Sequence, residues 1–163
     1  IRAAGFAHEN HEVLALAALR AILLIGGESA DGSRSWPFIA EARKGPGKSQ
    51  LWVRVNPLDG GDWEADLAGI MAAAPDGLIL PKPYSGADVH KLSIALDHAE
   101  SRFGLAGGKT RILAIVTEVP LSVLQLHTYV GSSNRLAALS WGAEDLGAVI
   151  GSLSSRDEQG AYT

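Results

Sequence analysis

Charged and amide side chains stand at the ends of four successive apolar segments of this chain. Segments of this kind, short and rich in Val, Ile and Leu, are typical of buried strands. If the strands are parallel, their carboxyl ends meet at one edge, where α/β proteins bind their ligands. The side chains are Arg54 and Asn56 after the first segment, Lys82 after the second, Glu118 after the third, and Glu144 and Asp145 after the fourth.

Two of these carboxylates predict a metal site. Glu118 follows mostly apolar residues and precedes Val119 and Pro120, so we expect it to be half-buried and in need of a cation or donors. Two carboxylates from adjacent strands, completed by waters and a substrate oxygen, are the usual way that proteins hold Mg²⁺, and Glu118 and Asp145 fit that role. Arg54 would face the metal as a fixed cation, suited to a planar carboxylate or a developing enolate oxygen.

Each residue also has a purely structural interpretation. Arg54 could form a salt bridge at a strand end, and Lys82 could be a solvated turn residue. Glu144 and Asp145 could simply be acids in the first turn of a helix, stabilised by its dipole. The coincidence of all these groups at one predicted edge favours a site over the separate structural interpretations.

The elements that must position these residues follow an alternating pattern. Uniformly apolar strands separated by amphipathic helices imply parallel strands buried on both faces, and therefore an α/β fold. Ser85, three positions before Asp88, predicts a capped helix start. The predicted strands are Arg20–Ile25, Leu51–Asn56, Gly77–Pro81, Arg111–Thr117 and Leu136–Trp141, and the predicted helices are Asp62–Ala74, Gly86–Phe103, Leu121–His127 and Ala143–Ile150. The segment 28–50 is expected to be irregular, with a helix only at Trp36–Arg43.

Length and composition limit the classes of function that the chain can have. With 163 residues, 47% of them hydrophobic, the chain predicts a single domain with a real core. A formal charge of −4 argues against nucleic acid and anionic membrane surfaces as partners. The absence of cysteine excludes thiol chemistry and fits the cytoplasm, and no apolar run is long enough to span a bilayer.

Three other features are better explained without a ligand. The stretch 42–49 almost spells a phosphate-binding loop, but its first required Gly is Ala42. His8 and His11 have a helical metal spacing without a third ligand. Trp141 is either a wall over the metal or, as we favour, a core residue.

The motifs VRVNPLD, PDGLILPK, ILAIVTE and WGAEDL stand in this order along the chain. In sequence and separation they closely resemble the citrate lyase β-subunit-like lyases of the HpcH/HpaI aldolase superfamily. The similarity covers residues 50–163, and residues 19–27 look like the family's first strand.

This resemblance implies a (β/α)8 barrel of the TIM type that cleaves a β-hydroxyacyl-CoA of the citryl-, malyl- or citramalyl-CoA type into a keto acid and an acyl-CoA, with Mg²⁺. By motif position, Glu118 and Asp145 match the metal ligands and Arg54 matches the arginine that binds substrate and stabilises the enolate. Asn56, Lys82 and Glu144 would then line the substrate site. The resemblance also implies a homo-oligomer, a trimer or a hexamer.

The chain is shorter than this family's pattern. About five of eight strands are expected, so the barrel is incomplete, and the acidic LDLED-type motif of the family occurs nowhere in the sequence. The general base therefore has no candidate. Two alternatives stay open: a CoA-independent hydroxy-keto-acid aldolase, and a catalytically silent remnant that binds metal or partner subunits. An intact mass near 17 kDa would favour the remnant.

Overall fold

A computed structural model describes residues 13–16, 21–25, 50–142, 144–154 and 156–161. The predicted irregular segment at 28–49, the helix at 36–43 and the histidines at 8 and 11 lie outside the described residues. Gln50, which we placed at the end of that segment, is the first residue of a strand.

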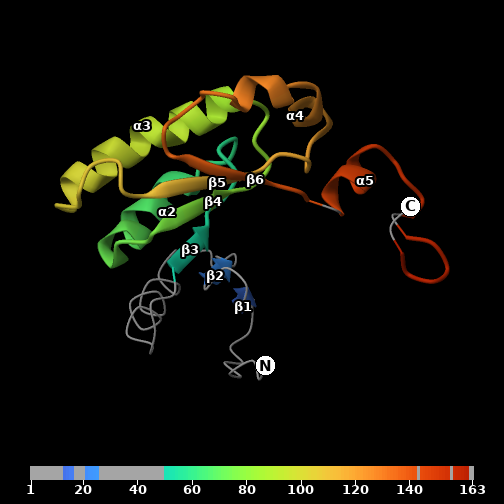
Figure 1. The fold of residues 1–163 in the computed structure, drawn as a ribbon, viewed down its shortest axis with the longest axis horizontal. Coiled ribbons are helices and arrows are strands. Elements are labelled where there is room, and N and C mark those ends of the chain that lie inside the picture. Colours follow the sequence, from blue (N-terminus) through green and yellow to red (C-terminus); the bar gives the residue numbers. More distant parts are fainter. Residues whose placement is uncertain (1–12, 17–20, 26–49, 143, 155, 162–163) are drawn as a thin grey trace.

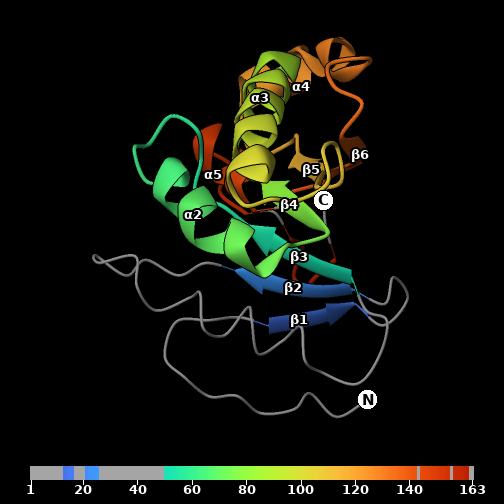
Figure 2. The ribbon, with the colours of Figure 1, turned by 90° about the vertical axis from the view of Figure 1, so that its left-hand side faces the viewer.

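A single six-stranded sheet organises the described chain, and its strands follow one another in chain order (Figure 2). The first pair is antiparallel, and every later pair is parallel. The strands are β1 (Val13–Leu16), β2 (Ala21–Ile25), β3 (Gln50–Arg54), β4 (Gly77–Leu80), β5 (Arg111–Ile115) and β6 (Leu136–Ser140).

The strand order identifies the type of α/β fold. A doubly wound sheet reverses direction at a switch point, so its neighbouring strands are not all consecutive in the chain. Here β2 to β6 are parallel and strictly consecutive, with helical segments after β3, β4 and β5, which is the arrangement of a (β/α) barrel. The predicted incomplete barrel is therefore confirmed.

Two helices cover one side of this sheet, as both views show (Figures 1 and 2). Helix α2 buries Trp63, Leu67 and Ile70, as expected of an amphipathic helix. Helix α3 buries Val89, Leu92 and Leu96, which lie on one of its faces. The helical elements are α2 (Trp63–Ile70), the 3₁₀ turn η1 (Met71–Ala73), α3 (Gly86–Arg102), α4 (Pro120–Leu124), the 3₁₀ turn η2 (Leu126–Tyr129) and α5 (Asp145–Val149).

The start of α3 is capped as the sequence predicted. The Ser85 hydroxyl accepts a hydrogen bond from the Ala87 amide at 3.2 Å, and the Asp88 carboxylate accepts one from the Ser85 amide at 3.3 Å. Because these bonds satisfy amides that have no partner inside the helix, the first turn of α3 is fixed directly after the loop that leaves β4.

Two predictions about the strands were wrong. No strand was predicted at β1, which pairs antiparallel with β2. Every strand was also expected to be buried on both faces, whereas the middle of β6 is exposed and its Leu139 side chain is 46% exposed. The reason is position: among the described strands, β6 has a neighbour on only one side.

None of the helices in the described ranges is long and apolar enough to cross a membrane.

Candidate metal and substrate site

The sheet register places the predicted site residues at one edge. Leu80 of β4 is paired with Ala114 of β5, and Ala114 is paired with Leu139 of β6. The three strands therefore end level with one another, and the loops that follow them carry Lys82, Glu118 and Asp145. Figure 1 shows α5, which begins at Asp145, beyond the carboxyl end of β6.

Glu118 is the most deeply buried member of the group. Its side chain is only 5% exposed, so it is more buried than the half-exposed carboxylate that we predicted. Its Oε2 atom accepts a hydrogen bond from the backbone N–H of Lys82 at 2.7 Å. Burial raises the pKa of Glu118; the Lys82 amide and the positive charges of Lys82 and Arg54 oppose this rise, whereas the negative charge of Asp145 adds to it. The four charged groups therefore act on one another at this edge.

Lys82 contacts both carboxylates of the predicted metal site. Its backbone donates to Glu118, and its Nζ atom lies 2.8 Å from Oδ1 of Asp145. The hydrogen bond to Asp145 raises the pKa of the Lys82 ammonium. Lys82 also has a φ of +49°, in the left-handed region that non-glycine residues rarely adopt. Such backbone strain persists only where its surroundings enforce it, and here the strained residue joins β4 to both acidic groups.

A pair of contacts between the segments that follow β5 and β6 positions Glu118. The Thr117 hydroxyl accepts a hydrogen bond from the Gly142 amide at 2.7 Å and donates one to the Gly142 carbonyl at 3.3 Å. A Cβ atom on Gly142 would lie only 2.4 Å from Cγ of Glu118. Glycine is therefore required at position 142 for the Glu118 side chain to lie where it does.

Arg54 and Asn56 complete the edge on the side of β3. Arg54 is half-buried, and its positive charge opposes the rise in the pKa of both Glu118 and Lys82. Asn56 is held by α2, because its backbone N–H and its side-chain amide both donate to Oδ2 of Asp66, at 2.7 and 3.0 Å. Burial raises the pKa of Asp66, and these two hydrogen bonds oppose that rise. Asp66 was not predicted from the sequence, although an acid on the partly buried side of a helix is a recognisable signal.

Glu144 and Trp141 lie in environments that differ from those of Glu118, Lys82 and Asp145. Glu144 is paired with Arg156 of the C-terminal loop at 3.2 Å, and its side chain is 65% exposed. Its predicted contact with substrate stays a prediction. Trp141 is 71% exposed, so our interpretation of it as a core residue was wrong.

The donor set fits a hard divalent ion that keeps part of its hydration. Among the described residues, no group of three or more His, Cys, Asp and Glu side chains is close enough together to hold a metal ion. Glu118 and Asp145 supply two carboxylates, and Mg²⁺ commonly binds through one or two carboxylates, with water and substrate oxygens at its other positions. The pair therefore fits Mg²⁺ better than a metal that needs a complete protein cage.

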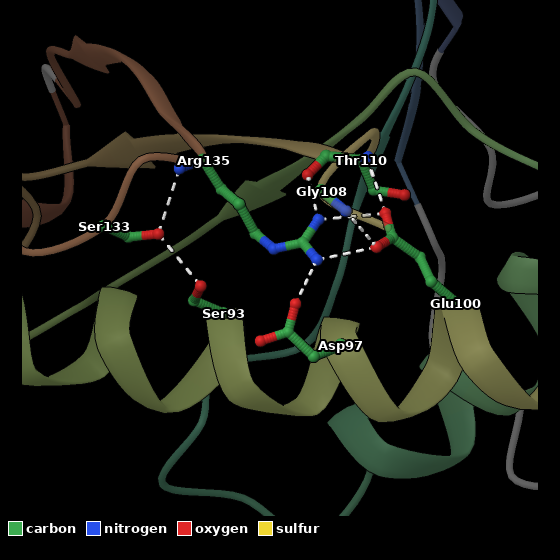
Figure 3. Close-up of polar contacts among 7 residues, drawn as sticks. All are labelled: Ser93, Asp97, Glu100, Gly108, Thr110, Ser133 and Arg135. Atoms are coloured by element: carbon green, nitrogen blue, oxygen red, sulfur yellow. Dashed lines mark hydrogen bonds and ion pairs between the residues drawn. The ribbon is translucent and has the colours of Figure 1, made fainter. Parts of the chain in front are cut away.

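A second polar cluster lies at the opposite, amino edge of the sheet (Figure 3). Arg135, which directly precedes β6, is 4% exposed and donates to both oxygens of Glu100, at 2.9 and 2.6 Å. It also contacts Asp97 and donates to the Thr110 carbonyl at 3.0 Å. The amides of Gly108 and Thr110 donate to Glu100 as well, each at 2.7 Å.

This cluster was not predicted from the sequence. Glu100 follows Leu96 by four positions and so lies on the apolar face of α3, where a carboxylate requires a buried cation. That spacing was the available signal. The cluster ties α3 to the beginnings of β5 and β6, at the end of the sheet remote from Glu118.

The model of the HpcH/HpaI aldolase/citrate lyase family matches residues 38–162. The chain belongs to this family.

The relatives that the sequence matches include enzymes of this family. The citrate lyase subunit beta of Haemophilus influenzae is 37% identical over 93 residues, which are 57% of this chain and 32% of that protein. The L-malyl-CoA/beta-methylmalyl-CoA lyase of Cereibacter sphaeroides is 32% identical over 110 residues, which are 64% of this chain and 33% of that protein. The matched part therefore spans about a third of the length of these curated relatives.

Solved structures of the family resemble this chain in fold. The citrate lyase beta subunit of Mycobacterium tuberculosis, complexed with oxaloacetate and magnesium, is 27% identical, with a TM-score of 0.61 over 91% of this chain and 60% of that chain. Protein CitE of the same organism, in complex with magnesium and acetoacetate, is 26% identical, with a TM-score of 0.63 over 91% of this chain and 56% of that chain.

Proposed function

We propose that this chain forms the metal-binding and substrate-binding part of a Mg²⁺-dependent carbon–carbon lyase that splits a β-hydroxyacyl-CoA into a keto acid and an acyl-CoA. The observation that carries the proposal is the buried Glu118 carboxylate, which interacts with Asp145, Lys82 and Arg54 at the carboxyl edge of the sheet. Relatives named citrate lyase subunit beta and malyl-CoA lyase, and magnesium in the titles of similar structures, support it.

Glu118 and Asp145 would hold the metal. Bound there, Mg²⁺ would act as a Lewis acid and template for the hydroxyl or keto oxygen of the substrate and its neighbouring carboxylate. The Lys82 amide and Gly142 keep the Glu118 carboxylate in its position for this role.

Arg54 would act on the other fragment. As the hydroxyl proton leaves and the keto group forms, the electron pair of the breaking carbon–carbon bond moves into the thioester and gives an enolate, which a proton on carbon converts into the acyl-CoA. A guanidinium beside the thioester oxygen would stabilise the charge that develops there, an effect of about 3 kcal/mol for a well-placed donor. Asn56, Lys82 and Glu144 are proposed to contact the substrate around this centre.

The proposal is tested by Mg²⁺-dependent release of a keto acid from L-malyl-CoA or citramalyl-CoA. We expect Glu118→Gln to abolish both Mg²⁺ binding and keto-acid release, because the amide removes the buried negative charge. The matched control is Glu64→Gln, which makes the same change on the exposed surface of α2. Full activity of Glu118→Gln would refute the metal assignment. Release of a keto acid only from a hydroxy-keto acid without CoA would favour the aldolase alternative.

Assembly of the chain into a trimer or hexamer stays a prediction.

A further inference from the structure

Lys82 contacts both carboxylates of the acidic pair formed by Glu118 and Asp145. Its main chain contacts one of them and its side chain contacts the other. The backbone N–H donates to Glu118 at 2.7 Å, and the ammonium lies 2.8 Å from Oδ1 of Asp145. The two contacts have different environments: Glu118 is buried, whereas the Lys82 and Asp145 side chains are 45% and 43% exposed. The ammonium is therefore the part of this arrangement that can move into solvent.

The ammonium lies on a carboxylate oxygen of Asp145, a residue that the proposed metal site would use. A divalent ion bound to the same carboxylate would lie close to the ammonium, and the repulsion between the two cations favours displacement of the ammonium. An ion pair as exposed as this one contributes little, so a divalent ion can displace it. The amide contact to Glu118 does not depend on the ammonium and can persist when the side chain leaves.

We propose that Lys82 is a positioning residue with two separable parts: its amide holds Glu118 in place, and its ammonium neutralises Asp145 in the metal-free protein and is expelled when Mg²⁺ binds. This inference rests on the proposed function, since it takes Glu118 and Asp145 as the metal ligands. Its consequence is that metal binding releases a cation at the edge where an anionic substrate would arrive.

The direction in which one substitution changes the Mg²⁺ affinity separates this role from a merely structural one. Lys82→Met removes the charge but keeps a long unbranched side chain and the backbone N–H that Glu118 requires. If the ammonium competes with the metal, Mg²⁺ binds about two- to fivefold more tightly to this variant, the factor expected from losing an exposed ion pair. If the ammonium only holds Asp145 in position, Mg²⁺ binds more weakly.

Isothermal titration with MgCl₂ measures this directly. The matched control is Lys109→Met, which removes the same charge from an exposed residue in the turn before β5, at the opposite edge of the sheet. We expect its Mg²⁺ affinity to equal that of the unsubstituted protein. Equal or weaker binding by Lys82→Met overturns the inference.

A second measurement follows the side chain itself. Reductive ¹³C-methylation keeps the lysine charges, and the Lys82 resonance is assigned by its loss in Lys82→Met. On addition of Mg²⁺, the Lys82 resonance should shift while that of Lys109 stays in place. A Lys82 resonance that does not respond to saturating Mg²⁺ overturns the proposal.

The same titrations distinguish a failure of the proposed lysine exchange from a failure of the proposed function. If Glu118→Gln loses Mg²⁺ binding but Lys82→Met binds no more tightly than the unsubstituted protein, the metal site stands and only the lysine exchange is refuted. If the unsubstituted protein binds no Mg²⁺, or if Glu118→Gln binds it normally, the proposed function fails and the exchange fails with it.

Discussion

Glu100→Gln is the substitution whose effect on stability follows most directly from the structure. Burial alone would raise the pKa of Glu100, but hydrogen bonds from Arg135, Thr110 and Gly108 lower it from 4.5 to about 2. That difference corresponds to about 3 kcal/mol of stability at neutral pH. Removing one partner of a buried ion pair costs a similar amount, about 3 to 5 kcal/mol. We therefore expect the free energy of unfolding to fall by about 3 kcal/mol.

The effect should depend on pH in a defined direction. Because the pKa of Glu100 is lower in the folded chain than in the unfolded chain, its carboxylate stabilises the fold fully above about pH 4.5. This contribution is lost as the pH falls from about 4.5 to about 2. The difference between the unsubstituted protein and Glu100→Gln should therefore shrink to less than half of its neutral value at about pH 3.

Urea denaturation followed by circular dichroism, repeated between neutral pH and about pH 3, measures both quantities. The matched control is Asp97→Asn, which alters another carboxylate on the same Arg135, but one whose side chain is 65% exposed. An exposed partner contributes at most about 1 kcal/mol, so the free energy of unfolding should fall far less in this variant than in Glu100→Gln. The reasoning is refuted if the two variants lose equal stability, or if the loss in Glu100→Gln does not change with pH.

Two further substitutions test the carboxyl edge of the sheet. Gly142→Ala places a Cβ atom 2.4 Å from Cγ of Glu118, so we expect Mg²⁺ affinity, measured by titration calorimetry, to fall about tenfold, as for other residues that orient metal ligands. Gly61→Ala, where an added Cβ meets nothing within 4 Å, is its control, and equal affinities would contradict the positioning role. Arg54→Met should lower the rate of keto-acid release about a hundredfold without weakening Mg²⁺ binding. A parallel loss of metal affinity would instead place Arg54 in the metal site.

Much of the fold could be predicted from local patterns. The apolar runs marked β2 to β6, because short Val- and Leu-rich segments bounded by turns have few other structures available. Ser85 and Asp88 marked the start of α3 through capping chemistry that operates within one helical turn. The resemblance carried by four motifs implied the barrel and the family, which the matching family model confirms.

The apolar pattern of the sequence predicted less about the surroundings of each strand. The sequence of β6 is as apolar as that of β4, yet β4 is buried throughout and the middle of β6 is exposed. Burial depends on the neighbours that a strand acquires in the sheet, which its own residues do not specify. The same reason explains Trp141, a large aromatic residue that the sequence favoured as core and that is 71% exposed.

The sequence by itself therefore determined which residues are available for chemistry and where along each strand they stand. Arg54, Lys82, Glu118 and Asp145 follow from the order of strands and from the rule that parallel strands end at one edge. Only the tertiary structure decided how these groups meet. Lys82 donates its amide to one carboxylate and its ammonium to the other, and Arg135 is buried against Glu100; these are contacts between residues 35 or more positions apart. Such contacts depend on register and backbone conformation, which no local pattern contains.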